Sequence, residues 1–131
     1  MASIFSKIVS GEIPSYKIAE DERCFAFLDI RPVAFGHTLV IPKEEVDYYF
    51  DLNDEYLAKL NVFAKKVAKA LKEVVPCERI GVMIAGLEVP HAHIHLIPMN
   101  SISDLSFTNP RPEISKEEML ELSEKLSKAF V

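Results

Sequence analysis

The stretch Pro90-His91-Ala92-His93-Ile94-His95-Leu96-Ile97-Pro98 places histidines at alternate positions of a short apolar segment. In an extended strand, successive side chains point to opposite faces, so His91, His93 and His95 share one face. A rise of about 3.3 Å per residue puts neighbouring imidazoles roughly 6.6 Å apart. The chain has 4 histidines, and the fourth, His37, opens another strand-like run. Because imidazole serves as nucleophile, acid, base or metal ligand near neutral pH, this strand predicts a functional site.

The pattern around this segment predicts an α+β fold with a mainly antiparallel sheet. Apolar residues at helical spacing indicate a long central helix, and Ser115 with Glu118 forms a capping box that opens a C-terminal helix. We expect one domain over residues 1–131, with a C-terminal helical extension over about 99–131. The predicted elements are a short helix or turn at 4–9, strands at 16–19, 24–29, 37–41, 79–84 and 91–97, and helices at 54–75 and 115–130.

Composition excludes several classes of protein. Of the 131 residues, 49% are hydrophobic, which suits a globular domain. The net charge of −5 argues against a nucleic-acid partner or a basic membrane surface. No apolar run approaches the roughly 18 residues of a membrane span, and the first ten residues lack a secretory signal, so we expect a cytoplasmic protein. Cys24 and Cys77 are far apart, which does not indicate a cysteine-rich zinc site.

The row of histidines is compatible with three kinds of chemistry. A neutral imidazole can attack an electrophilic phosphorus while a neighbour binds the phosphoryl oxygens. Alternatively, the histidines can bind zinc. The outer pair, His91 and His95, lie about 13 Å apart by strand rise, so one ion would not reach all three strand histidines. A pair of them together with His37 could bind it. In the third interpretation the histidines form a buried structural network. The residues alone leave these alternatives open.

The segment 91–97 resembles the motif His-φ-His-φ-His-φ-φ of the histidine triad (HIT) family, in which φ is apolar. Other parts of the chain are similar to the same family in the same order. They are the opening segment 4–9 with Glu12-Ile13-Pro14, the block 25–30 with Pro32, and the block 36–43. The resemblance therefore covers roughly residues 4–98, and four ordered blocks make it specific.

The resemblance implies an enzyme that cleaves nucleotides at the α-phosphate, and it assigns a role to each histidine. His93 matches the nucleophile, and the backbone carbonyl of His91 fixes its tautomer. His95 matches the contact to phosphate or to the leaving group. His37 matches a member of the same imidazole cluster behind the site.

The resemblance also implies a nucleoside site and a homodimer. Asp29 matches the acid that binds ribose hydroxyls, and Gly86 matches a close backbone approach to phosphate. The matching apolar base pocket consists of Ile4, Phe5, Ile8, Phe27, Ile30 and Leu39. We therefore predict a nucleotide hydrolase acting on a purine phosphoramidate, acyl-nucleotide or dinucleoside polyphosphate through a nucleotidyl-histidine. No metal cofactor is required, although Mg²⁺ can accompany a polyphosphate substrate.

The chain departs from the family in the loop before the triad. Leu87 stands where glutamine is common, Glu88 stands near a position that is often a small hydroxyl residue, and no asparagine precedes them. This departure motivates one alternative function, a non-catalytic nucleotide-binding or adaptor protein. A second alternative is a zinc hydrolase that uses His37 with part of the triad.

Overall fold

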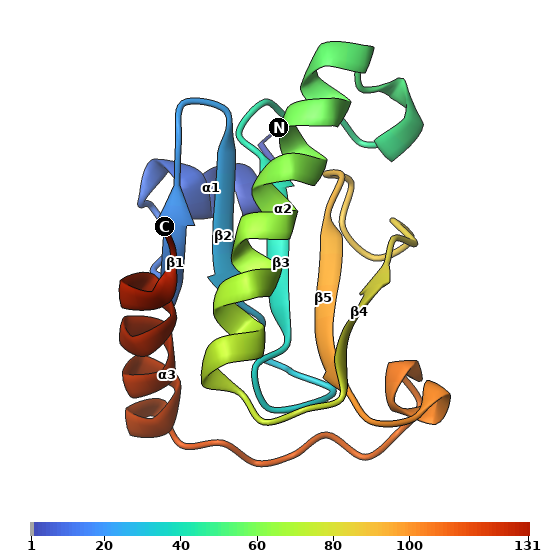
Figure 1. Ribbon diagram of the computed structural model, residues 1–131. Helices are drawn as coiled ribbons and strands as arrows, with labels where there is room; N and C mark the ends of the chain where they lie inside the picture. Colours follow the sequence, from blue (N-terminus) through green and yellow to red (C-terminus); the bar gives the residue numbers. More distant parts are fainter. Residues whose placement is uncertain (1) are drawn as a thin grey trace.

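An antiparallel sheet of five strands forms the centre of the computed structural model, which describes residues 2–131. The strands lie in the spatial order β1-β2-β3-β5-β4, and every neighbouring pair is antiparallel (Figure 1). Their bounds are β1 Lys17–Glu20, β2 Cys24–Leu28, β3 Thr38–Pro42, β4 Arg79–Met83 and β5 Ile94–Met99. The strand that contains His95 therefore lies between β3 and β4.

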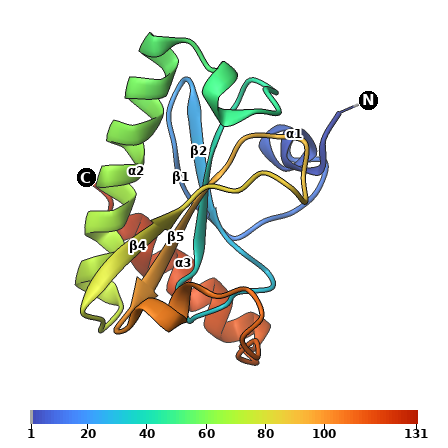
Figure 2. The ribbon, with the colours of Figure 1, turned by 90° about the vertical axis from the view of Figure 1, so that its right-hand side faces the viewer.

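Helices cover both faces of this sheet. The long helix α2 (Asp54–Val74) lies across one face, and α3 (Lys116–Ala129) packs beside it over β1 (Figure 1). The short helix α1 (Ile4–Ser10) lies on the opposite side of the sheet from α2, as Figure 2 shows. Two short 3-10 helices, η1 (Tyr49–Asp51) and η2 (Ile102–Leu105), lie in the connections before α2 and after β5.

Strand β2 is buried on both faces, which explains its unbroken apolar sequence. In β2, Cys24, Ala26 and Leu28 belong to the main core together with residues of α2 and α3. Phe25 and Phe27 point the other way and pack with residues of α1 and β3. The second cluster is smaller, and it borders the histidines.

The predicted α+β fold, with its antiparallel sheet, central helix and C-terminal helix, is confirmed. The capping box is present, because Ser115 Oγ accepts the Glu118 backbone N–H while the Glu118 carboxylate accepts the Ser115 N–H. The prediction of a strand beginning at His91 is wrong, since β5 begins only at Ile94. Ahead of β5, Ala92 N–H donates to the carbonyl of Val46, in the loop after β3, so the pairing with β3 ends. None of the helices within residues 2–131 is long and apolar enough to cross a membrane.

Candidate active site

The four histidines meet where β3 and β5 pair, on the sheet face that carries α1. His95 lies in β5 directly opposite Leu39 of β3. His37, His91, His93 and His95 are all buried. The expected even row along one strand is wrong, because the chain ahead of Ile94 leaves the sheet. Instead, the rings of His93 and His95 lie 4.9 Å apart between centroids, while the His91 ring packs on Phe5 at 5.8 Å.

The hydrogen bonds of His93 determine which ring nitrogen carries the proton. Its Nδ1 lies 2.7 Å from the carbonyl oxygen of His91, which can only accept, so Nδ1–H donates. The neutral ring then has its lone pair on Nε2. That atom has no hydrogen-bond partner within residues 2–131. Since no buried side-chain nitrogen or oxygen there lacks a partner, Nε2 is accessible. His93 therefore presents an available lone pair, as a nucleophile requires.

A chain of hydrogen bonds gives His95 the opposite arrangement. The backbone N–H of Val33 donates to His37 Nδ1 at 3.1 Å, so the proton of the neutral His37 ring is on Nε2. His37 Nε2–H in turn donates to His95 Nδ1 at 2.9 Å, which leaves the His95 proton on Nε2. His95 is thus a donor beside the His93 lone pair.

Burial keeps these rings in the neutral form that the hydrogen bonds require. Burial, opposed by the charge of Asp29, lowers the pKa of His37 from 6.5 to about 4. Burial and the neighbouring His93, His37 and Arg111 lower the pKa of His95 to about 3. Burial also lowers the pKa of His91. At neutral pH the His37–His95 pair therefore holds no cation.

A tight backbone turn positions His37. Gly36 has a φ of +93°, and a Cβ at this position would lie 3.0 Å from Val75 Cγ2 and 3.1 Å from Pro98 Cγ. A larger residue would strain the backbone and push against the end of α2 and β5. Glycine therefore lets the loop enter β3 with His37 facing His95.

A network that sequence reasoning missed holds His91. Its Nε2–H donates to the carbonyl of Pro42 at 2.8 Å, so its Nδ1 accepts the Ser3 hydroxyl at 2.8 Å. Ser3 also caps α1 by accepting the Ser6 backbone N–H. Glu45 Oε1 accepts the Ser3 N–H at 2.6 Å and the Ser6 hydroxyl at 2.7 Å. The one signal for this network in the sequence is that Ser3, a residue type common at helix N-caps, directly precedes α1.

Asp29 lies beside the histidine chain. Its Oδ1 accepts the Arg31 backbone N–H at 2.8 Å, and its Oδ2 lies 3.6 Å from His37 Nε2. The side chain is 20% exposed, so the carboxylate remains within reach of a ligand. The structure thus brings the predicted ribose-binding acid to the histidine cluster.

The predicted base-pocket residues divide into buried and exposed groups. Phe5, Phe27 and Leu39 are buried in the smaller cluster, and Ile8 packs against it. Phe5 lies 5.1 Å from the His93 ring, between centroids. Ile4 and Ile30, by contrast, are 49% and 75% exposed. The apolar cluster therefore adjoins His93, and the two isoleucines offer exposed apolar surface.

On another side of His93, the loop before the triad lines a cavity of about 300 Å³. Gly86 lies in this loop with a φ of +78°, and a Cβ there would meet no atom within 4 Å. Glycine is therefore favoured at this position by the positive φ, and no neighbouring atom of the chain requires the absence of a Cβ. Besides His93, the cavity is lined by Asp47, Tyr48, Tyr49, Phe50, Ile84, Ala85, Gly86, Leu87 and Ala92.

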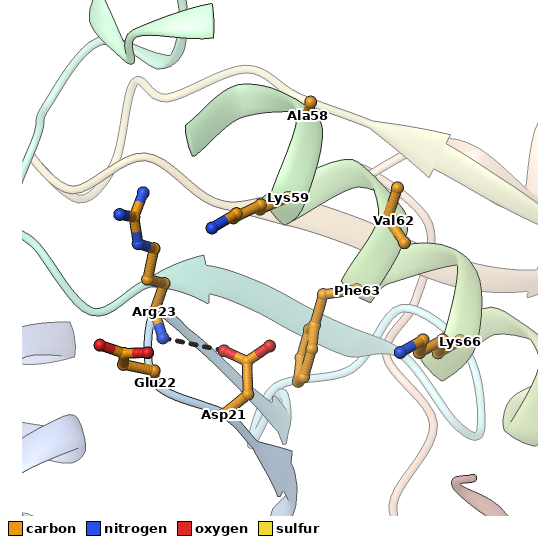
Figure 3. A pocket seen from close by; sticks show the side chains of 8 residues that line it. All are labelled: Asp21, Glu22, Arg23, Ala58, Lys59, Val62, Phe63 and Lys66. Carbon is orange, nitrogen blue, oxygen red and sulfur yellow. Dashed lines mark hydrogen bonds between the residues drawn. The ribbon is translucent and has the colours of Figure 1, made fainter. Parts of the chain in front are cut away.

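A second cavity, of about 480 Å³, lies away from the histidines (Figure 3). It lies between the β1–β2 turn and α2, where Lys59 and Lys66 face the turn that contains Asp21 and Arg23. The Arg23 N–H donates to the Asp21 carboxylate, and Glu55 pairs with both Arg23 and Lys59. No histidine lines this cavity, so its size does not identify the reactive site.

One group within residues 2–131 could also hold a metal ion. It consists of Asp29, His37 and His95, whose potential ligand atoms lie within 4.8 Å of one another. However, His37 Nε2 and His95 Nδ1 are joined directly by the 2.9 Å hydrogen bond. A metal bound to both atoms would displace the proton between them and separate the rings. The observed arrangement therefore fits a hydrogen-bonded pair better than a pair of ligands.

Known proteins share this motif and this fold. A family model described as the HIT domain matches residues 10–102. The adenosine 5'-monophosphoramidase of Schizosaccharomyces pombe is 41% identical over 133 residues, covering 97% of this chain and 97% of its own. A hypothetical histidine triad nucleotide-binding protein from Sulfolobus tokodaii has a TM-score of 0.85 at 30% identity, covering 97% of this chain and 91% of its own. A zinc-bound histidine triad family protein from Mycobacterium smegmatis has a TM-score of 0.84 at 32% identity, covering 99% of this chain and 94% of its own. The chain belongs to the HIT, or histidine triad, family.

Proposed function

We propose that this protein is a nucleotide hydrolase that cleaves a purine nucleotide derivative at its α-phosphate. The observation that carries the proposal is the opposite protonation of two adjacent rings. His93 has its lone pair on Nε2, and His95 has its proton on Nε2. A lone pair beside a donor is the arrangement that attack at phosphorus needs.

In the proposed reaction, His93 Nε2 forms a bond to the α-phosphorus while the bond from phosphorus to the leaving group breaks. The His93 ring becomes cationic, and the His91 carbonyl that accepts its Nδ1–H stabilises that charge. His95 Nε2–H donates a hydrogen bond to a phosphoryl oxygen or to the leaving atom, and the leaving group takes its proton from solvent. Water then attacks phosphorus, the N–P bond breaks, a proton passes to solvent, and the mononucleotide leaves with His93 neutral again.

The nucleoside is proposed to bind between Asp29 and the apolar cluster. The Asp29 carboxylate can accept hydrogen bonds from two ribose hydroxyls. The exposed Ile4 and Ile30 offer apolar contact to a planar base, and the Phe5 ring lies 5.1 Å from the His93 ring, between centroids. Gly86, in the loop that lines the cavity beside His93, is proposed to approach the phosphate.

Among the leaving groups, a phosphoramidate is the first candidate. The Schizosaccharomyces pombe relative is named an adenosine 5'-monophosphoramidase, which supports an adenosine nucleotide with a P–N bond. Acyl-nucleotides and dinucleoside polyphosphates are the other candidates, and Mg²⁺ would accompany a polyphosphate. The homodimer is part of the proposal, and light scattering over a concentration series tests it. The cytoplasmic location stays a prediction.

Release of AMP from an adenosine phosphoramidate tests the proposal. We expect turnover by the wild type, a loss of several orders of magnitude in His93→Ala, and no effect of a chelator. Activity that persists in His93→Ala would contradict the histidine mechanism. Tight nucleotide binding without product from any leaving group would favour the non-catalytic adaptor.

A zinc hydrolase is the second candidate function. The cluster of Asp29, His37 and His95 and the zinc-bound relative from Mycobacterium smegmatis favour it. Stoichiometric zinc in the purified protein, together with loss of turnover on chelation, would support this alternative over the metal-free mechanism.

A further inference from the structure

The segment between η2 and α3 contributes side chains to the histidine cluster. In Figure 1 this orange segment crosses the lower end of the sheet from η2 to α3. The Phe107 ring stacks on the His37 ring, at 6.0 Å between centroids and 18° between planes. The same Phe107 ring meets the edge of His95 at 4.9 Å and 61°. One aromatic side chain thus contacts both members of the hydrogen-bonded pair.

Arg111 connects this segment to the loop that contains Asp29. Its guanidinium lies over the Phe107 ring, with Cζ 5.6 Å from the centroid, and its Nη2 donates to the Phe107 carbonyl at 3.3 Å. Its Nη1 donates to the carbonyl of Arg31, across 80 residues of sequence. The Arg31 N–H in turn donates to Asp29. A planar guanidinium can reach both carbonyls and the ring at once, which a lysine ammonium cannot.

We propose that Phe107 and Arg111 are positioning residues that hold the His37–His95 pair and the Asp29–Arg31 loop in one fixed arrangement. We call these two residues the Phe107–Arg111 clasp. The expected effect of the clasp on catalysis rests on the proposed function, whereas its effect on the orientation of the His37 and His95 rings does not. Neither residue touches the reacting atoms in this account. They act through His95, which donates to the substrate, and through Asp29, which binds ribose.

The physical reason is that an imidazole ring can turn about its Cβ–Cγ bond, and a half-turn puts a ring carbon where each nitrogen was. The chain from Val33 through His37 to His95 holds only if both rings keep their present orientation. Phe107 packs against the His37 ring and the His95 ring, so its side chain obstructs the turning of both. Burial is the main cause that lowers the pKa of both His37 and His95, and Asp29 opposes it at His37. The charge of Arg111 adds to the lowering at both rings, as does neighbouring His93, and so favours their neutral form.

Proton–nitrogen correlation NMR at neutral pH tests the ring positions directly, because the chain has only 4 histidines. In the wild type we expect His37 and His95 as neutral rings protonated on Nε2. In Phe107→Leu and in Arg111→Gln we expect mixed tautomers at both rings. His91 and His93 are held by backbone carbonyls and should keep their signals, which makes them internal controls.

Lys116→Gln is the matched control, because it removes one exposed cation from the same extension at the first position of α3. Its spectrum should equal that of the wild type. Signals of His37 and His95 that stay unchanged in both Phe107→Leu and Arg111→Gln would overturn the clasp. If Phe107→Leu does not fold, the spectra of Arg111→Gln and Arg111→Lys test the clasp alone. Arg111→Lys should show mixed tautomers of His37 and His95, although it keeps the positive charge.

Steady-state kinetics with an adenosine phosphoramidate provides the second readout. Phe107→Leu should lower kcat about 10-fold with little change in KM, because it misplaces the donor of His95. Arg111→Gln should also raise KM about 10-fold, because it releases the Asp29–Arg31 loop. Equal kinetics in these variants and in Lys116→Gln would overturn the catalytic role. A wild type that turns over none of the three candidate substrate classes would instead refute the proposed function, while the NMR comparison would still test the clasp.

Discussion

Ser3→Ala should destabilise the protein more than the loss of an ordinary helix cap. Ser3 is buried at 6% exposure and uses one hydroxyl twice, for the cap of α1 and for His91 Nδ1. Loss of the cap costs about 1 kcal/mol. A buried acceptor left without its donor costs about 1–3 kcal/mol more. The expected loss in the free energy of unfolding is therefore about 2–4 kcal/mol.

Ser115→Ala provides the matched control. Ser115 caps α3 with the same geometry, but it lies on the surface and binds no histidine. Its loss should cost only about 1 kcal/mol. Urea unfolding of the wild type and both variants gives the two differences in the free energy of unfolding. We expect the free energy to depend on urea concentration with the same slope in all three proteins. Equal destabilisation by Ser3→Ala and Ser115→Ala would refute the contribution of the Ser3–His91 hydrogen bond.

The ionisable groups of the structure give three further predictions. The folded pKa values of His37 and His95, about 4 and 3, lie below the usual 6.5, so the unfolded chain binds protons first as pH falls. The free energy of unfolding should therefore decline from about pH 6.5 toward pH 4, by at most about 1.4 kcal/mol per pH unit for each histidine. Urea midpoints that stay unchanged over this pH range would contradict this prediction. Asp29→Asn should raise KM for an adenosine phosphoramidate about 10-fold while the tautomer of His93 stays unchanged, and an unaltered KM would refute the ribose contact. Burial raises the pKa of Cys24 to about 12, so a thiol reagent should modify Cys77 in the native protein and Cys24 only after unfolding, and equal native rates would contradict this.

Local sequence signals predicted most of the fold. The helical spacing of apolar residues placed α2, and the Ser115–Glu118 capping box placed the start of α3 within one residue. The apolar runs of β2 and β3 also marked strands within one residue of their observed bounds, because both runs are buried on two faces. Such signals are contained within each element and need no knowledge of its partners.

Features that depend on distant contacts could not be predicted in this way. The alternation of residues continues through His91, yet β5 begins at Ile94 because Ala92 bonds to the Val46 carbonyl instead of to β3. Phe107 and Arg111 lie in an ordinary polar connection, and only the fold brings them to residues far away in the sequence. Histidine spacing identified the cluster, whereas its tautomers follow from hydrogen bonds to backbone groups.

The most direct test of the central claim is intact mass measured after rapid quench of the protein with an adenosine phosphoramidate, with AMP assayed in the same samples. Wild type and His93→Ala are compared side by side. We expect a transient adenylyl adduct on the wild type alone, with AMP formed only by the protein that carries His93. An adduct on His93→Ala, or AMP release by that variant at the wild-type rate, would contradict it.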